Sequence, residues 1–306
     1  MLNEFEKKIY KFIKNYNIYE KYDKILLAIS GGKDSMSLLK VMYKISKIMN
    51  LEIGVAHFNH KIRKESEEEK IFVEEEAKKL KIKYYYGEAN EKNYKNIELS
   101  ARNMRYDFLF DIAKKNNYNK IATAHHMSDL VETIIYRLSR GTGIYGVSGL
   151  LPINEMLTRP MLTVTLKEII NYVTIDNVKY KIDKSNFENN YSRNRIRNKI
   201  LPELELINDN FENNFFKFAR IAWEYRQQVE NEYLKRIHQN ENKFYFDIKK
   251  DIFDEEVLRL FFLRCKQYPP NYEETKKIIK MGSKKSKQFK GIKIEKNKNT
   301  LIIERE

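Results

Sequence analysis

The sequence predicts an α/β fold in which a parallel sheet with helices on both faces is followed by a smaller, mainly helical C-terminal domain. Two observations support this. Short apolar runs alternate with helical patterns over the first 140 residues, and long helical patterns follow Pro202. Alternation of strand and helix is typical of parallel sheets, because parallel neighbours need a crossover between them. We place the domains at residues 1–205 and 206–306.

Each expected element rests on a local pattern. Strands are expected where a short apolar run stops at turn or polar residues, at 24–29, 53–58, 83–86 and 121–124. Helices are expected where apolar residues return every three or four positions, at 36–49, 67–80, 100–115, 129–140, 209–238 and 255–267. Residues 292–304 are expected to form two short strands, which can pair as a β-hairpin at the end of the second domain.

The composition favours a reduced, cytoplasmic protein. The 306 residues include one cysteine, Cys265, which excludes an internal disulfide framework and any zinc site built on paired cysteines. No apolar run approaches the ~18 residues of a membrane span, and the charged start of the chain lacks the apolar stretch of a signal peptide. We therefore expect no membrane partner.

The charge balance indicates a polyanionic partner such as a nucleic acid. Lys and Arg number 58 against 43 Asp and Glu, which gives a formal net charge of +15. Ten lysines and one glutamate fall within residues 275–298, where we expect Lys284, Lys285 and Lys287 to contact phosphates. Several arginines are also grouped, which suits bidentate contacts to anions. A general enrichment of the chain in lysine is the competing explanation.

The segment Ser30-Gly31-Gly32-Lys33-Asp34-Ser35 joins the first expected strand to the first expected helix. Adjacent glycines let the backbone approach a ligand closely, and the N–H groups at a helix start favour an anion. The spacing is neither that of a Walker A loop nor the GxGxxG of dinucleotide sites. A Gly-Gly turn with a serine cap is the alternative, but the whole pattern after an apolar strand favours a phosphate site.

Polar side chains follow two of the expected strands. His57, Asn59 and His60 lie at the end of the second strand, and His125 follows the fourth. In open α/β sheets, ligands bind outside the carboxyl ends of the strands, so these side chains are expected to face one crevice. Purely structural histidines, or a zinc site that no cysteine supports, are the alternatives.

Two carboxylates, Asp129 and Glu132, stand three residues apart in the expected helix at 129–140. This spacing projects both side chains from one face of its first turn. Acidic residues are favoured at a helix start in any case, because they complement the helix dipole. Spacing alone therefore leaves a binding role and a purely structural role open.

Together these motifs resemble the tRNA(Ile)-lysidine synthetase family, a branch of the N-type ATP pyrophosphatases that share the SGGKDS loop. Four further family segments occur in family order: H-x-N-H-x-x-R-x-x-S at 57–66, E-x-x-A-R-x-x-R-Y-x-F at 98–108, A-H-H-x-x-D-x-x-E-T with R-G-x-G at 124–143, and D-x-S-N with R-N-x-x-R at 183–197. The resemblance covers residues 24–202.

The resemblance implies a PP-loop ATP pyrophosphatase domain at 1–205. It also implies ATP-dependent ligation of free L-lysine to C2 of the wobble cytidine in a CAU-anticodon tRNA(Ile), with AMP and pyrophosphate released from an adenylated cytidine. The second domain would bind the tRNA. Mg²⁺ is expected as a cofactor beside ATP, with Asp34 as its protein partner, because this ion combines carboxylate with phosphate oxygens.

The site residues then take expected roles. Asp34, Asp129 and Glu132 would be catalytic, and the last two would hold the lysine ammonium. The expected ATP-binding residues are Ser30, Gly31, Gly32, Lys33, Asp34, Ser35, His57, Asn59, His60, Arg105 and His125. Contacts to phosphates or tRNA are expected from Arg63, Arg102, Arg193 and Arg197, together with Lys284, Lys285 and Lys287.

The chain departs from the family pattern at Ser128 and Leu130, where most members have Asp and Gln. Two other functions stay open as alternatives. A tRNA thiolase of the same superfamily generally delivers sulfur through paired cysteines or an iron–sulfur cluster, whereas only Cys265 exists here. The other alternative is a non-catalytic tRNA- or nucleotide-binding protein. The sequence also leaves open whether the protein is a monomer or a homodimer.

Overall fold

A computed structural model of the chain describes residues 1–61, 66–89, 97–181 and 192–305. The chain divides into two compact units, one made of residues 1–140 and 149–217 and the other of residues 141–148 and 218–306. The main division between the units thus falls at residue 217, whereas the sequence predicts residue 205.

A six-stranded sheet forms the centre of the first unit, in the order β3-β2-β1-β4-β6-β5. All neighbouring strands are parallel except β5 and β6. The strands are β1 (Lys24–Ala28), β2 (Glu52–Asn59), β3 (Lys83–Glu88), β4 (Lys120–Ala122), β5 (Ile153–Asn154) and β6 (Leu157–Thr158). Ile25, Leu26 and Leu27 of β1 are fully buried, as a parallel strand covered on both faces requires.

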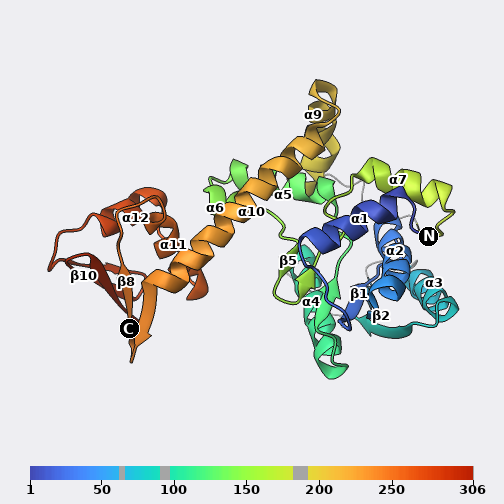
Figure 1. The fold of residues 1–306 in the computed structure, drawn as a ribbon, viewed down its shortest axis with the longest axis horizontal. Coiled ribbons are helices and arrows are strands. Elements are labelled where there is room, and N and C mark those ends of the chain that lie inside the picture. The colour runs from blue at the N-terminus through green and yellow to red at the C-terminus, as the bar shows by residue number, and fades with distance from the viewer. Residues whose placement is uncertain (62–65, 90–96, 182–191, 306) are drawn as a thin grey trace. The chain divides into compact units, whose positions relative to one another are not determined.

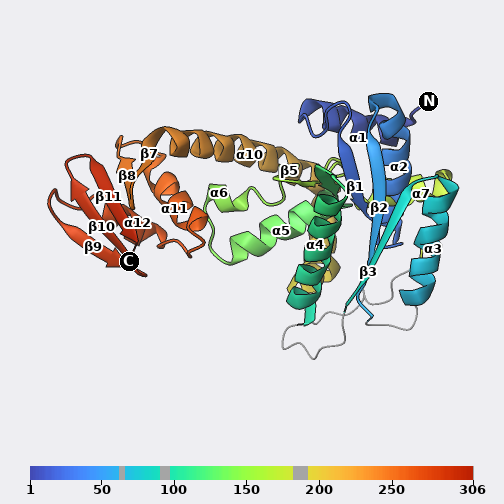
Figure 2. The ribbon, with the colours of Figure 1, turned by 90° about the horizontal axis from the view of Figure 1, so that it is seen from below.

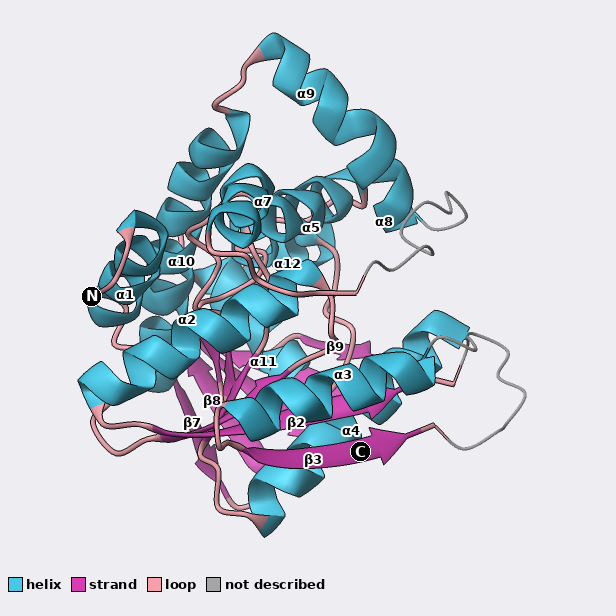
Figure 3. Ribbon diagram, turned by 90° about the vertical axis from the view of Figure 1, so that its right-hand side faces the viewer, coloured by secondary structure: helices cyan, strands magenta, loops and turns pink. Residues whose placement is uncertain are grey.

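Helices cover both faces of this sheet. α2 (Lys33–Met49) and α3 (Ser66–Lys79) pack on one face, and α4 (Ile97–Lys115) packs on the other (Figure 2). Figure 3 looks onto the first face, where α3 runs along β2 and β3. The chain moves outward from β1 to β3 through α2 and α3 and returns to β4 through α4. Right-handed crossovers in opposite directions place these helices on opposite faces.

The N-terminal helix α1 (Glu4–Asn15) lies beside α2 and α7 (Leu166–Ile175) (Figure 1). Its Glu6 carboxylate is fully buried. Lys44 Nζ on α2 lies 2.6 Å from Glu6 Oε1, and the Tyr172 hydroxyl on α7 donates to the same oxygen at 2.9 Å. Burial of the charge is offset by these two partners, which fix α1 against both helices.

The rest of the first unit surrounds α5 (Met127–Ser139). The segment at 192–217 packs against α5. It consists of α8 (Ser192–Arg195), the π-helical turn η2 (Ile196–Ile200), α9 (Leu201–Ile207) and the start of α10 (Phe211–Arg236). Ile196, Leu201 and Phe211 pack against Val131 of α5 in one apolar cluster. This packing brings the side chains of the η2 segment to the first turns of α5.

The second unit contains a five-stranded antiparallel sheet in the order β7-β8-β11-β10-β9. Its elements are α6 (Ile144–Val147), β7 (Ile237–Asn240), β8 (Lys243–Asp247), α11 (Asp254–Arg264), α12 (Tyr272–Ile279), β9 (Ser286–Phe289), β10 (Ile292–Asn297) and β11 (Thr300–Arg305). Phe261 of α11 and Ile278 of α12 share an apolar core with Phe246, Ile294 and Leu301 of the sheet. Strand β11 occupies the middle of the sheet, so the end of the chain is part of this core.

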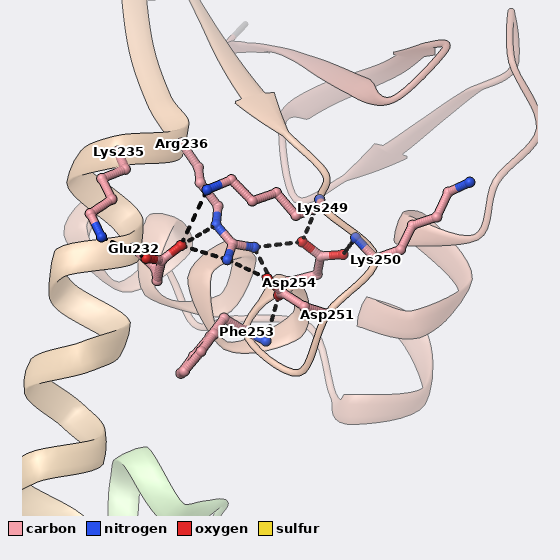
Figure 4. Close-up of polar contacts among 8 residues, drawn as sticks. All are labelled: Glu232, Lys235, Arg236, Lys249, Lys250, Asp251, Phe253 and Asp254. Carbon is pink, nitrogen blue, oxygen red and sulfur yellow. Dashed lines mark hydrogen bonds and ion pairs between the residues drawn. The ribbon is translucent and has the colours of Figure 1, made fainter.

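A buried arginine joins the end of α10 to the loop before α11 (Figure 4). The Arg236 side chain is 1% exposed, and its guanidinium lies 2.6 Å from Glu232 Oε2, 2.6 Å from Asp251 Oδ2 and 2.9 Å from Asp254 Oδ1. Asp254 also accepts the backbone N–H of Lys250 at 2.7 Å. The buried cation is therefore fully paired, which its burial requires.

The expected fold class is confirmed. The expected strands and helices of residues 24–140 are present, with ends that differ by at most three residues. The C-terminal unit holds more strand than expected, because β7, β8 and β9 extend the expected β10–β11 hairpin to five strands. Strand β7 follows α10 directly, and the apolar spacing of the helix continues into the first residue of β7. The sequence pattern therefore does not show where the helix ends and the strand begins. No helix in the described ranges is long and apolar enough to span a membrane.

Candidate active site

The carboxyl ends of β1 and β4 lie side by side at the centre of the first sheet. The chain leaves β1 over one face and reaches β4 from the other, so its course reverses between these strands. Ligands bind at such a reversal in open α/β sheets. A cavity of about 390 Å³ opens at this edge, lined by the segments after β1, β2 and β4 and by residues of α3 and α4.

The loop between β1 and α2 forms one wall of the cavity. Ser35 Oγ accepts the N–H groups of Ser30 and Gly31, each at 3.2 Å, and donates to the Gly32 carbonyl at 2.9 Å. Gly31 has a φ of +95°, which L side chains rarely adopt, so glycine is required there. The first N–H groups of α2 have no partner within the helix. The loop is therefore held in a shape that can receive an anion.

Asp34 extends from the first turn of α2 into the cavity. Lys33 Nζ lies 3.6 Å from its Oδ1. This buried oxygen has no hydrogen-bond partner among the described residues, which is uncommon and leaves it able to bind a cation. Within the same described ranges, no group of three His, Cys, Asp or Glu side chains is placed to hold a metal ion alone.

His57 lines the cavity and is held neutral. Its Nδ1 lies 2.9 Å from the Ile29 carbonyl, which can only accept, so Nδ1 carries the proton. The other nitrogen, Nε2, is buried without a hydrogen-bond partner in the described part of the chain. Burial lowers the pKa of His57. A neutral His57 can therefore accept a hydrogen bond from a ligand through Nε2.

Two further histidines of the cavity are also held neutral. Burial lowers the pKa of His125 to about 3, and the arginines around it act in the same direction. Its Nδ1 lies 2.7 Å from Thr123 Oγ1. Burial lowers the pKa of His60 to about 4, with help from the Arg105 charge. Both side chains are therefore uncharged at neutral pH.

Asp129 and Glu132 lie on the first turns of α5 and share one partner, Arg197 of η2. An Arg197 amino nitrogen lies 2.8 Å from Asp129 Oδ1, and Arg197 Nε lies 2.5 Å from Glu132 Oε1. Asp129 lines the cavity, whereas Glu132, one turn further along α5, is not among the lining residues. The two expected lysine-binding carboxylates thus point at the same position, and a guanidinium occupies that position.

The surroundings of the two carboxylates shift their pKa values in opposite directions. For Asp129, burial opposes ionisation, but His126, His125 and Arg197 together lower its pKa to about 2. For Glu132, burial is the stronger effect and, with the negative charge of Asp129, raises its pKa despite Arg197. Asp129 is therefore a permanent anion, and Glu132 is the better proton acceptor of the two.

One arginine of the described residues, Arg105 of α4, lines the cavity. Arg102 and Arg105 flank the Tyr106 ring on α4, with guanidinium carbons 5.2 Å and 5.3 Å from its centroid. Burial lowers the pKa of Arg105. Arg193 donates to Thr133 Oγ1 at 3.0 Å.

The cavity brings together most residues that the sequence predicts for ATP. Its lining includes Ser30, Gly32, Asp34, Ser35, His57, Asn59, His60, Arg105 and His125. Gly31 and Lys33 belong to the same loop but do not line the cavity. Arg63 falls outside the described residues. Lys284, Lys285 and Lys287 belong to the second unit, where the first two are exposed and the third is half-buried.

Sequence reasoning missed some residues of this region. The Ser128 hydroxyl donates to the Glu212 carboxylate of α10, whose pKa is raised by burial, and Leu130 is fully buried in the core. The departure at 128–130 therefore places a carboxylate from another helix beside α5. Thr123 lines the cavity and orients His125. Its place at the end of a strand is the signal that could have identified it.

Comparisons with known proteins agree with this geometry. The PP-loop domain family model matches residues 1–204. A tRNA(Ile)-lysidine synthase from Petrotoga mobilis is 47% identical over 308 residues, which cover 99% of each chain. One from Thermosipho africanus is 39% identical over 271 residues, which cover 87% of this chain and 62% of the relative.

Among solved structures, a U34-tRNA thiolase from Methanococcus maripaludis superposes with a TM-score of 0.61. The match covers 72% of this chain and 78% of the thiolase, at 15% sequence identity, and concerns the fold alone. The family match and the full-length relative together settle the classification. The chain carries a PP-loop domain and belongs to the tRNA(Ile)-lysidine synthase family.

Proposed function

We propose that this protein uses ATP to join free L-lysine to C2 of the wobble cytidine in a CAU-anticodon tRNA(Ile). One observation carries the proposal: the anion-binding loop at Ser30–Ser35 and the carboxylate Asp129 line the same cavity. A ligase that activates one substrate with ATP and then admits an amine needs both features within one site. Full-length similarity to a tRNA(Ile)-lysidine synthase supports the choice of substrates.

The loop and Asp34 serve the ATP half of the reaction. The cytidine C2 oxygen attacks the α-phosphorus, and the bond to pyrophosphate breaks. N–H groups at the start of α2 bind the departing pyrophosphate as its charge develops. Asp34 would hold Mg²⁺, because its unpartnered Oδ1 supplies one carboxylate oxygen while phosphates and water supply the rest. The ion would neutralise phosphate charge.

Asp129 and Glu132 serve the lysine half. The ε-amine attacks C2 of the adenylated cytidine, and AMP leaves with the bonding electrons. With a reference pKa of about 10.4, removing the proton from the amine at pH 7 costs roughly 4–5 kcal/mol. Asp129 stays ionised and holds the ammonium, while the raised pKa of Glu132 makes it the proton acceptor.

Basic side chains would hold the tRNA through its phosphates. The candidates in the described part of the chain are Arg102, Arg193, Arg197, Lys284, Lys285 and Lys287. A homodimer and a cytoplasmic location stay predictions.

Sulfur transfer is the second candidate function. The Methanococcus thiolase is described with a [4Fe-4S] cluster. This chain has a single cysteine, Cys265, which lies in the second unit and not in the unit that contains the cavity. One thiol cannot hold such a cluster. The residues present therefore favour the amine-ligating reaction.

The test is incubation of the full chain with radiolabelled lysine, ATP, Mg²⁺ and a CAU-anticodon tRNA(Ile) transcript, followed by nucleoside analysis. The label should appear in one modified cytidine at the wobble position. The same tRNA with uridine at that position should remain unlabelled. Label on the 3′-terminal adenosine, or no label in RNA, would contradict the proposal.

A further inference from the structure

Arg197 occupies the position that the proposed function gives to the substrate ammonium. Its guanidinium lies 2.8 Å from Asp129 Oδ1 and 2.5 Å from Glu132 Oε1. The Glu132 side chain is only 5% exposed and that of Asp129 20% exposed. The protein without ligands thus already satisfies both carboxylates with a cation of its own.

We propose that Arg197 closes the lysine pocket until ATP binds, and that the ATP phosphates draw it off the carboxylates. This inference rests on the proposed function, because it assumes that lysine is the incoming cation. Binding is then ordered, with ATP before lysine.

Competition between the two cations follows from charge and space. An ammonium and a guanidinium both need the same carboxylate oxygens, and two cations between one pair of acids repel each other. Arg197 is attached to the site and therefore competes without a loss of translational freedom. Lysine alone must displace it from Asp129 and Glu132 together, so its affinity for the ATP-free protein is reduced.

The phosphate loop offers Arg197 another partner nearby. Asp129 lines the same cavity as Ser30, Gly32 and Asp34. The charge of Asp34, in the first turn after the loop, already acts on Arg197. A triphosphate in the loop brings several negative charges into this region, and guanidinium binds phosphate oxygens in a bidentate manner. The side chain is 37% exposed, so it is not locked in place by packing.

The local backbone conformation is consistent with movement of Arg197. Arg197 lies in η2, a π-helical turn between α8 and α9. Such turns are rare, and they occur frequently at functional sites. Its neighbour Arg195 is exposed on α8 and forms no ion pair within the described residues, which provides a control in the same segment. Arg197 is thus the arginine of this segment that both carboxylates hold.

The experiment measures lysine affinity by calorimetry on the full chain without RNA. Each protein is titrated with and without Mg²⁺ and an ATP analogue whose α–β bridge is a methylene group, so that pyrophosphate cannot leave. In the wild type, the analogue should tighten lysine binding about 10-fold or more, within the usual range of coupling between sites. In Arg197→Met, lysine should bind more tightly than to the wild type without the analogue, and the analogue should change little.

Two further variants complete the test. Arg195→Met should keep the wild-type dependence on the analogue. Arg197→Lys retains a cation but can bridge the carboxylates less well, so its lysine affinity should depend on the analogue to an intermediate degree. This variant also takes the place of Arg197→Met if loss of the ion pair prevents folding.

The outcomes separate the two proposals. Equal lysine affinity with and without the analogue in the wild type, or weaker lysine binding by ATP-free Arg197→Met, would overturn the gating role alone. A wild type that binds the analogue but never binds lysine would overturn the proposed function, and the gating role with it.

Discussion

Asp129 and Arg197 are 68 residues apart in the chain, yet an oxygen of one lies 2.8 Å from a nitrogen of the other. The contact joins the start of α5 to η2, and packing of Ile196 and Leu201 against Val131 holds these segments together. This ion pair thus depends on the apolar packing of the two segments that carry its partners. This relationship sets different expectations for the two carboxylates.

Removing the charge of Asp129 should weaken lysine binding specifically. In Asp129→Asn, loss of a charge-assisted contact of about 1.5–3 kcal/mol should raise KM for lysine roughly 10- to 150-fold, with KM for ATP little changed. In Glu132→Gln, kcat should fall as well, because the proposed proton acceptor is lost. Steady-state kinetics with each substrate varied would check this. Equal losses in both KM values would mean that the pair shapes the whole site.

Acid should destabilise the first unit through its neutral histidines. His125 has a folded-state pKa of about 3 against about 6.5 when unfolded, so the unfolded chain binds more protons between these values. The stability it contributes is present above pH 6.5 and is lost as the pH falls below that, by about 1.4 kcal/mol at pH 5.5.

Replacing His125 by glutamine should therefore reduce the loss of stability between pH 7.5 and 5.5, as measured by denaturant unfolding followed by circular dichroism. The control is His238→Gln, which removes a histidine of β7 whose side chain is 56% exposed. This variant shows how far the loss of an exposed histidine alone alters the unfolding curves. An identical pH dependence in His125→Gln and the wild type would show that His125 is not held neutral by the fold.

Three lysines after α12 should contribute a non-specific, salt-dependent part of tRNA binding. Lys284, Lys285 and Lys287 form no ion pairs within the described structure. Replacing all three by serine should lower the slope of log affinity against log salt by about 2–3, since each phosphate contact contributes about 0.7–0.9. ATP binding should not change.

Substitution is the appropriate change here, because truncation before Thr275 would remove β9, β10 and the central strand β11. The control is a triple serine variant at exposed lysines of the first unit, Lys81, Lys114 and Lys115. Filter binding at two or more salt concentrations gives the slopes. Coinciding slopes for the wild type and the Lys284–Lys287 variant would favour general lysine enrichment over a binding role.

Arg236 should be a main determinant of stability in the second unit. Arg236→Met leaves the buried Asp254 carboxylate without its cation, which typically costs about 3–5 kcal/mol. Lys235→Met removes an exposed pair with Glu232 and should cost at most about 1 kcal/mol. Trp223 is the only tryptophan and is buried in the same unit, so its fluorescence follows this unfolding. Similar midpoints for the two variants would contradict the structural role of Arg236.

Local patterns were sufficient to predict the core of the site. The loop at Ser30–Ser35 and the polar residues His57 and His125 each follow a buried strand, and parallel strands bring their carboxyl ends to one edge. The predicted helix that contains Asp129 and Glu132 begins two residues earlier than expected, at Met127, and keeps both side chains on one face. These predictions needed nothing beyond strand order and helix periodicity.

The rest depends on contacts between distant segments. Periodicity cannot pair Arg197 with Glu132, or Ser128 with Glu212, because the partners lie 65 and 84 residues apart. The same limit explains the missed strands of the second unit. Strand β8 pairs with β11, more than 50 residues away, and its short run between polar residues reads equally well as a loop.

The central claim is that ATP is cleaved to AMP and pyrophosphate to attach lysine to a cytidine. The most direct test counts all products in one reaction that contains ATP labelled at the α-phosphate, labelled lysine and the CAU-anticodon tRNA. We predict one AMP and one pyrophosphate for each lysine found in the RNA, and none of the three products with Asp34→Asn. ADP and phosphate as products, or AMP release that continues at the same rate without lysine entering the RNA, would contradict the account.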